Sequence, residues 1–255
     1  MANLLLVSGL DPSGGAGFLA DARVAERHGL RAIGAISALT VQTSEGVRAV
    51  EPISAELVGA QLTALLGDSE IAAGKIGMLG HESVAEAVAE ALHLTAAPIV
   101  WDPILTASAG RVSLYRGDAR RALSLLRDHL AVMTPNLAEA SALTGLDVRD
   151  IAGMRRAAQV LSDLGPACLI KGGHLVDDAG LVDVLAVGGS IVEIAGARIA
   201  GGTEVHGTGC ALATALACRL ACGEALATAA AEAAAFVRTR LAAPARSGRG
   251  KPSVM

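Results

Sequence analysis

Short runs of consecutive apolar residues recur along the chain, and longer stretches with helically spaced apolar positions separate them. A strand covered on both faces is apolar throughout, so the short runs predict strands at 3–8, 32–41, 72–79, 98–102, 130–134, 167–172, 181–187 and 190–196. The periodic stretches predict helices at 16–28, 54–67, 81–93, 118–129, 136–143, 152–164, 208–222 and 224–241.

Strands alternate with helices over most of this pattern, which favours an α/β fold with a mostly parallel sheet covered by helices on both faces. The last two predicted strands are joined by the short turn Gly-Gly-Ser, so they are expected to form an antiparallel hairpin at one edge. No internal repeat or change of composition divides the chain. The prediction is one domain over residues 1–245, followed by a short C-terminal tail, 246–255.

The composition permits a large core. Apolar residues make up 52% of the chain and charged residues 18%, which excludes global disorder. Aromatic residues are only 2%, so the core must consist mainly of Ala, Val, Leu and Ile, and helices of that composition pack closely on a sheet. A net charge of −4 and the absence of a Lys/Arg stripe argue against nucleic acid as the main partner.

Neither terminal region has the pattern of a membrane or export segment. The start "MANLLLVSGLDPSGG" lacks a basic segment and a long apolar run, so no signal peptide is expected. Residues 211–237 are apolar but interrupted by Arg219, Gly223, Glu224 and Glu232, so a membrane span is not expected. Four cysteines without metal-ligand spacing fit reduced thiols in a cytoplasmic protein.

Ligands of open parallel sheets bind beyond the carboxyl ends of the strands, where this chain carries unusually specific polar and glycine-rich segments. Most informative is "HGTGC" (206–210), which opens the Ala-rich helix at 208–222. Glycines let a ligand approach the first-turn N–H groups, Thr208 adds a hydroxyl, and the thiolate of Cys210 is favoured at a helix start. The alternative is a glycine turn before a buried helix, with Cys210 as a small core residue.

Other segments at this edge allow two readings each. "SGLDPSGGAG" (8–17) opens a helix but matches neither a Walker A loop nor a dinucleotide fingerprint, and Asp21 beyond it either faces the ligand edge or caps the surface. In "KGGH" (171–174), Lys171 either reaches a polyphosphate or lies in a solvated turn. In "TPNLAEA", Asn136 and Glu139 either face a magnesium–water shell or form a capping box. His174 and His206 are expected to be surface or hydrogen-bonded residues rather than metal ligands.

Lysine usage adds weight to two of these segments. Only three of the 21 basic residues are lysines, namely Lys75, Lys171 and Lys251. A chain that otherwise uses arginine is expected to keep lysine where a compact charge on a flexible stem is needed. Lys75 and Lys171 both fall inside the motifs "KIGML" and "KGGH".

The segments "SGLDPSGGAG", "KIGML", "TPNLAEA", "KGGH" and "HGTGC", in this order and spacing, resemble the hydroxymethylpyrimidine/phosphomethylpyrimidine kinases of thiamine biosynthesis. The resemblance covers nearly the whole chain and implies a ribokinase-like three-layer α/β/α sandwich. The related pyridoxal and pyridoxine kinases usually carry Asp where this chain has Cys210, which favours the pyrimidine kinases. The implied activity is ATP-dependent phosphorylation of 4-amino-5-hydroxymethyl-2-methylpyrimidine, of its monophosphate, or of both.

The resemblance also implies roles for individual residues. The pyrimidine contacts are matched by Gly9, Asp21, Thr40, Gln42 and Met78, and Gln42 and Asp21 suit the exocyclic amine and ring nitrogens of an aminopyrimidine. The lysine near the ATP phosphates is Lys171, and the catalytic anion hole is matched by Gly207, Thr208, Gly209 and Cys210. ATP contacts are expected from Lys171, Asn136, Thr208 and Gly209. Mg²⁺ is expected to be held through water by Glu139 and Asp102. Cys210 is expected near the acceptor oxygen, as a weak base or as a further contributor to the anion hole.

The chain departs from the family pattern at several positions. Ser108 replaces a common lysine, Leu10 follows the first glycine, "Q-T-S" (42–44) replaces "Q-N-T", and Val205 precedes the histidine. These departures leave open which acceptors react, and in particular whether both phosphorylation steps occur. The alternatives are therefore a pyridoxine or pyridoxal kinase, and a pyrimidine-binding homologue that is catalytically weak. A homodimer is expected from the habit of the family.

Overall fold

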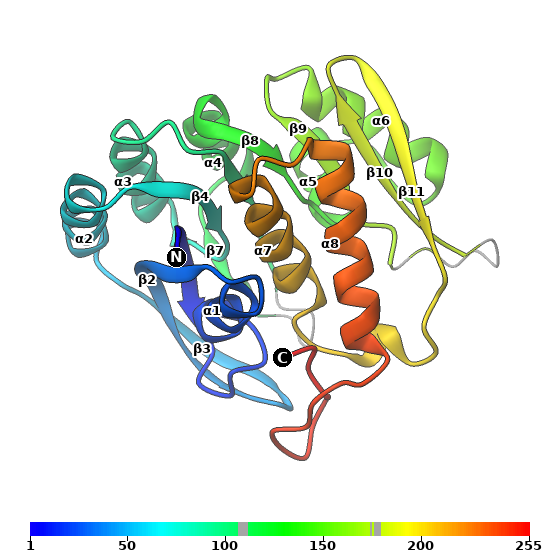
Figure 1. Ribbon diagram of the computed structural model, residues 1–255, viewed down its shortest axis with the longest axis horizontal. Helices are drawn as coiled ribbons and strands as arrows, with labels where there is room; N and C mark the ends of the chain where they lie inside the picture. The colour runs from blue at the N-terminus through cyan, green and yellow to red at the C-terminus, as the bar shows by residue number, and fades with distance from the viewer. Residues whose placement is uncertain (107–111, 174, 176–179) are drawn as a thin grey trace.

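The computed structural model describes residues 1–106, 112–173, 175 and 180–255 (Figure 1). A nine-stranded sheet crosses the whole protein. Its strands, from edge to edge, are β11 (Ser190–Gly196), β10 (Leu181–Val187), β9 (Ala167–Ile170), β8 (Leu130–Met133), β6 (Ile99–Trp101), β4 (Ile71–Ile76), β1 (Asn3–Leu10), β2 (Arg31–Thr43) and β3 (Gly46–Pro52).

The six strands from β9 to β2 are parallel to one another, and antiparallel strands close both edges. At one edge β10 runs antiparallel to β9 and forms a hairpin with β11, as the Gly-Gly-Ser turn predicts. At the other edge β3 folds back on β2. The parallel arrangement brings the carboxyl ends of β1, β4, β6, β8 and β9 to one end of the sheet.

Helices cover both faces of the sheet and give the predicted three-layer sandwich. One face carries α1 (Gly17–Arg27), α7 (Thr208–Ala221) and α8 (Leu226–Leu241). The other face carries α2 (Ala55–Asp68), α3 (Glu82–Leu92), α4 (Ala119–Leu126), α5 (Leu137–Thr144) and α6 (Ile151–Ser162). Two short 3₁₀ turns, η1 (Arg127–His129) and η2 (Gly202–Glu204), complete the chain's helical segments in its described part.

Helix α7 lies against the centre of the sheet (Figure 1), and its residues 210–218 are all buried. Alanines along this helix contact the apolar side chains of β1, β4 and β6, among them Leu4, Leu6 and Val100. Small side chains let the helix axis approach the strands closely, which explains why an Ala-rich sequence occupies the middle of the core. The start of α7 is thereby fixed at the carboxyl ends of the central strands.

All eight predicted strands and all eight predicted helices are confirmed, with ends that differ by a few residues. The sequence pattern misses β3, because "GVRAVEP" is short, mixes charged with apolar residues and has only Val50 buried. It also misses the two-residue strands β5 (Gly80–His81) and β7 (Tyr115–Arg116), which pair with each other outside the main sheet. Strands this short leave no periodic signal.

The last residues return to the body of the protein rather than extending away from it. We call residues 245–255 the C-terminal strap. The His206 amide donates to the Pro252 carbonyl over 2.8 Å, and the Lys251 amide donates to the Ser44 carbonyl over 3.0 Å. The Val254 side chain is fully buried in the α7/α8 core. The predicted boundary after residue 245 therefore falls at the start of a segment that packs against the β2–β3 turn and the segment before α7.

Within its described part, the chain has no helix whose length and apolar character would let it cross a bilayer.

Candidate functional site

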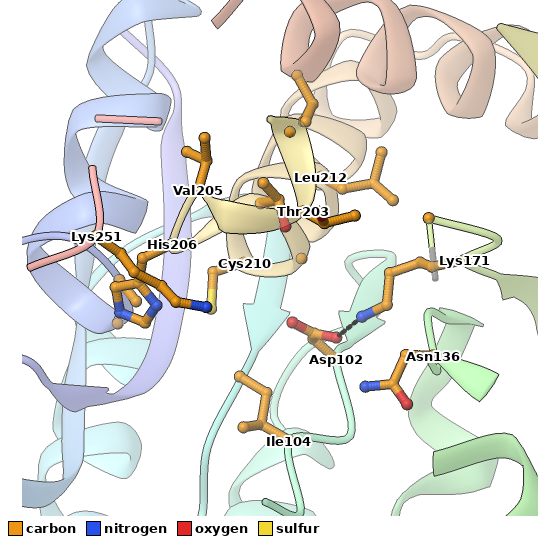
Figure 2. Close-up of a pocket in the computed structure, with 18 of the residues that line it drawn as sticks. Asp102, Ile104, Asn136, Lys171, Thr203, Val205, His206, Cys210, Leu212 and Lys251 are labelled. Carbon is orange, nitrogen blue, oxygen red and sulfur yellow. Dashed lines mark hydrogen bonds and ion pairs between the residues drawn. The ribbon is translucent and has the colours of Figure 1, made fainter. Parts of the chain in front are cut away.

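A long cavity lies at the carboxyl ends of the parallel strands, where the predicted motifs meet (Figure 2). The start of α7, residues 207–210, lines its middle. One end, which we call the β2 end, is lined by residues of β1, β2 and the segments that follow β4 and β6, including Gly9, Thr40, Gln42, Met78 and Leu114. The other end, the α8 end, is lined by residues of β10, α8 and the segment after β11, including Leu181, Ala197, Ile199, Val237 and Leu241.

The turn before α7 depends on Gly207. This residue is the N-cap of the helix and has a left-handed backbone with φ +82°. A β-carbon here would also collide with the carbonyl oxygen of Gly15 in the turn before α1. The two glycine-rich turns therefore pack directly against each other, and a glycine N-cap leaves the first-turn N–H groups of α7 without a capping side chain. Such a helix start is suited to an anion.

An ion-paired cluster lies beside this turn. The Lys171 ammonium donates to Asp102 Oδ1 over 2.6 Å and lies 3.9 Å from Glu139 Oε2. A β-carbon on Gly209 would be 3.2 Å from Lys171 Nζ, so the glycine leaves space between the helix start and the ammonium. Burial lowers the pKa of Lys171, but Asp102 and Glu139 outweigh it, and the net pKa is raised. Lys171 is therefore a permanent cation next to the helix start.

Glu139 takes part in the capping box that was the alternative reading of "TPNLAEA". Its carboxylate accepts from the Asn136 amide over 2.8 Å, and the Asn136 side chain accepts from the Glu139 amide over 2.9 Å. Burial raises the pKa of Glu139 to about 7, Asp102 adds to the rise, and Lys171 opposes it. The capping box is thus confirmed, and it holds both residues at the cavity wall.

A polar cluster marks the β2 end of the cavity. His206 Nε2 lies 3.1 Å from Gln42 Nε2 and 3.4 Å from Asp11 Oδ2. Asp11 also accepts hydrogen bonds from the amide and hydroxyl of Ser13. Burial alone would raise the pKa of Asp11, but hydrogen bonds from His206 and Ser13 hold it below its ordinary value. His206 is hydrogen-bonded, as predicted, and joins the turn before α1 to β2.

Thr40, Met78 and Gly9 lie together at the same end, as their shared assignment requires. The Thr40 hydroxyl donates to the Leu10 carbonyl over 2.9 Å, and Gly9 has no space for a side chain because Met78 Cε fills it. The buried Ser37 hydroxyl donates to the Met78 carbonyl. Gly9, Thr40, Met78 and Leu114 line a slot at this end together with the Gln42 amide, which suits a flat, polar-edged ring.

The sequence profile of the phosphomethylpyrimidine kinase family matches residues 11–255 of this chain. The chain belongs to that family. The hydroxymethylpyrimidine/phosphomethylpyrimidine kinase of Rhizobium meliloti is 38% identical over 215 residues, which cover 83% of this chain and 80% of the relative. The family also accounts for the recurrence of all five motifs around one cavity.

Two solved structures extend the comparison to three dimensions. The phosphomethylpyrimidine kinase of Clostridium difficile has a TM-score of 0.80 at 28% identity, covering 94% of this chain and 99% of its own. The pyridoxal kinase of Staphylococcus aureus, solved in complex with AMP-PCP and pyridoxal, has a TM-score of 0.89 at 27% identity, covering 100% and 93%. The fold of this kinase is thus shared with enzymes of two acceptor specificities.

Of the five predicted pyrimidine contacts, Asp21 is the one that does not line the cavity of the kinase. It is fully buried beneath the cavity floor, where its Oδ2 accepts from Lys75 over 2.6 Å and from Ser8 over 2.8 Å. Its Oδ1 accepts from Thr214 of α7 over 2.8 Å. Both oxygens are therefore used inside the protein, and direct contact with an acceptor ring does not fit this geometry. Through Ser8, which lines the cavity, Asp21 instead positions the floor.

Asp21→Asn is therefore expected to cost stability rather than acceptor recognition. The amide keeps the hydrogen bonds to Ser8 and Thr214 in part but leaves the Lys75 ammonium buried without a counter-ion, which costs about 3 kcal/mol. Urea unfolding measures this loss, and the double variant Asp21→Asn/Lys75→Met is expected to recover part of it. A selective rise in acceptor KM at unchanged stability would instead assign Asp21 to the ring.

Burial disfavours the thiolate that the sequence predicts at Cys210. The residue does lie in the first turn of α7 at the cavity wall, but it is only 8% exposed. Burial raises the pKa of the Cys210 thiol to about 11, because the loss of water outweighs the attraction of the nearby Lys75 ammonium, and Asp21 and Asp102 raise it further. A thiol with a raised pKa is a poor base at neutral pH, so burial favours the second predicted role, that of a weak donor in the anion hole.

Alkylation checks the protonation of Cys210. At pH 8, iodoacetamide is expected to modify the exposed Cys222 readily and Cys210 about 100-fold more slowly than an ordinary thiol of pKa near 8.5. Peptide mass spectrometry follows each site, and unfolding in urea should make all four cysteines react alike. Equal rates at Cys210 and Cys222 in the folded kinase would contradict the shifted pKa.

Several site residues escape the sequence reasoning. Ser8, Asp11 and Gly15 lie inside the quoted motif "SGLDPSGGAG" without an assigned role. The segment after β11 and the C-terminal strap also line the cavity, but they carry no motif that points there. The sequence gives only an indirect indication of the strap's role, because Lys251 is one of only three lysines in the chain. Ser108 and His174 lie outside the described residues.

Proposed function

We propose that this kinase transfers the γ-phosphoryl group of ATP to the hydroxymethyl oxygen of 4-amino-5-hydroxymethyl-2-methylpyrimidine and to the monophosphate of that pyrimidine, as steps of thiamine biosynthesis. Membership of the family supports the reaction class, and curated relatives bear the names of both activities. The observation that carries the proposal is one continuous cavity with the Gly207–Cys210 turn at its middle. A helix start between the two ends of one cavity suits transfer of an anionic group from one end to the other.

The pyrimidine fits the β2 end. Gly9, Thr40 and Met78 form the slot, and the Gln42 amide at its rim can both donate to a ring nitrogen and accept from an exocyclic amine. The contact between His206 Nε2 and the Gln42 amide nitrogen fixes the Gln42 side chain in this place. With the ring in the slot, the hydroxymethyl group is expected to face Cys210, whose thiol can donate to the acceptor oxygen.

ATP fits the α8 end. Apolar side chains of Leu181, Ile199, Val237 and Leu241 line it and suit the adenine ring. The AMP-PCP complex of the Staphylococcus aureus pyridoxal kinase supports ATP as the donor for this fold. The phosphates would then extend along Asn136 and Lys171 towards Thr208 and Gly209. ADP is the expected product.

Lys171 and the helix start provide the charge neutralisation that phosphoryl transfer needs. The Lys171 ammonium and the first-turn N–H groups of α7 approach the same point of the cavity, beside Gly209. These groups are fixed before the substrates bind, so no reorganisation is required when charge develops on the moving phosphoryl group. The role of this chain is therefore mainly positioning and electrostatic stabilisation.

Mg²⁺ is expected to accompany ATP. The described acidic residues nearest to Lys171 are Asp102 and Glu139, and both line the cavity. Two carboxylates fit the habit of Mg²⁺, which keeps several waters and takes one or two carboxylates with substrate phosphates. The described part of the chain holds no cluster of three or more acidic, His or Cys ligands. Bound there, Mg²⁺ would neutralise phosphate charge.

Release of ADP tests the proposal. A coupled assay with Mg²⁺·ATP compares the pyrimidine alcohol, its monophosphate and pyridoxal as acceptors. Both pyrimidines are expected to react. Pyridoxal is the second candidate, because the pyridoxal kinase of Staphylococcus aureus has the higher TM-score, 0.89 against 0.80. A folded preparation that releases ADP with neither pyrimidine would exclude the proposed function.

A further inference from the structure

Lys251 differs from the other two lysines of the chain in how its charge is used. Lys75 is fully buried and paired with Asp21, and Lys171 is paired with Asp102. Lys251 lies on the C-terminal strap, lines the cavity, and has a side chain that is 38% exposed. Its ion pair in the described part of the chain is to Glu204, which is 71% exposed, over 3.8 Å. An exposed pair at this distance contributes little, so the ammonium remains available to a ligand.

The backbone of Lys251 is held firmly although its side chain is not buried. Its amide donates to the Ser44 carbonyl, and the amide of Gly250 donates to the Ser44 hydroxyl, each over 3.0 Å. Pro252, the next residue, accepts from the His206 amide. The strap therefore fixes Lys251 between the β2–β3 turn and the segment that leads into α7. Figure 2 shows its side chain on the His206 side of the Cys210 turn, away from Lys171.

A phosphorylated acceptor needs a cation at the β2 end of the cavity, close to the Cys210 turn. Its phosphate would lie between the acceptor ring and the γ-phosphate of ATP, where two anions repel each other. Lys171 is already shared by Asp102 and Glu139, and Lys75 has no access to the cavity. The other described ionisable groups facing the β2 end are Asp11 and His206, which interact with each other.

We propose that Lys251 binds the phosphate of a monophosphate ester in the acceptor position, and so determines whether the kinase accepts a phosphorylated as well as an unphosphorylated pyrimidine. This inference rests on the proposed function. A flexible ammonium suits the task, because it can follow the phosphate as the γ-phosphoryl group approaches, and it can point away when the acceptor is the alcohol.

Acceptor kinetics of Lys251→Met test the assignment. With the monophosphate, kcat/KM is expected to fall about 10–100-fold, mainly through KM, as for the loss of a hydrogen bond to a charged group. With the alcohol it is expected to change less than about twofold, which lies within the spread of surface substitutions. Lys251→Arg should restore most of the loss. The matched control is Arg249→Met, which removes the same charge two residues away, at an exposed position outside the cavity lining.

Calorimetric titration with the monophosphate, without ATP, separates this inference from the proposed function. Lys251→Met is expected to weaken binding of the monophosphate by the same factor and to spare binding of the alcohol, whether or not turnover occurs. Equal losses for both acceptors would make the strap merely structural and overturn the inference. So would unchanged monophosphate binding in the variant, or failure of the wild-type protein to bind the monophosphate. Absence of turnover alone would overturn only the kinase activity.

Discussion

Lys171→Met is expected to lower kcat about 10²–10³-fold with little change in the KM for the pyrimidine, the loss typical of removing one stabilising group from the transition state. Methionine keeps most of the volume of the lysine stem, so the cavity wall should remain. The substitution removes the positive charge that lies beside Gly209 at the start of α7. Asp102 would then face the phosphates without the ammonium that lies 2.6 Å from it. Steady-state kinetics with saturating ATP measure the effect.

The same substitution at Lys75 provides the matched control for Lys171. Lys75 likewise has a carboxylate partner, but it is fully buried and does not line the cavity. Lys75→Met is expected to lower the free energy of unfolding with little change in kcat. Lys171→Met also leaves the buried Asp102 without its counter-ion, but it should lower kcat far more than Lys75→Met does. Measuring both variants well below their melting temperatures separates the two effects. Retention of kcat within tenfold in Lys171→Met would contradict the role of Lys171 in transfer.

Gly207→Ala is expected to reduce turnover about 10²-fold or more, because a displacement of about 1 Å in a positioned group can cost that much. The left-handed backbone conformation of Gly207 costs an alanine residue about 1–2 kcal/mol. Its β-carbon would in addition collide with the Gly15 carbonyl and push apart the two turns that frame the cavity. Both kcat and the unfolding free energy should therefore fall.

Gly223→Ala separates these two causes. Gly223 lies just beyond the other end of α7, has φ +79°, and has open space where a β-carbon would go. The Gly223→Ala variant is expected to lose about 1–2 kcal/mol of unfolding free energy, because alanine must adopt a left-handed backbone, while kcat stays unchanged. If both alanine variants lose activity equally, then general destabilisation of α7 explains the effect, and the contact between the turns does not.

The fold was largely predictable because its signals are local. Apolar runs give the central strands, and periodic stretches give the helices that cover them. Strand β3 was missed because its position depends on pairing with β2 rather than on its own pattern. The path of the C-terminal strap is equally hidden, since it is held mainly by backbone hydrogen bonds to Ser44 and His206, which leave no periodic pattern in the sequence.

The sequence predicts the candidate site correctly where residues of a single motif line one part of the cavity. Gly9, Gln42, Lys171 and the Gly207–Cys210 turn all line the cavity, as the motif order requires. Asp21 and Cys210 show the limit of this reasoning. Helix spacing cannot reveal that Lys75, from another strand, reaches the Asp21 carboxylate, nor that burial outweighs the helix start at Cys210. The roles of the other residues, the homodimer and the cytoplasmic location stay predictions.

Competition between acceptors tests the central claim most directly. The kinase is incubated with Mg²⁺·ATP and an equimolar mixture of the pyrimidine alcohol and pyridoxal, and mass spectrometry quantifies both phosphorylated products at early times. The product ratio equals the ratio of the two kcat/KM values. We expect the pyrimidine phosphate to exceed pyridoxal phosphate by about 10-fold or more, the discrimination that one pocket contact can supply. An excess of pyridoxal phosphate, or no product from the pyrimidine, would contradict the account.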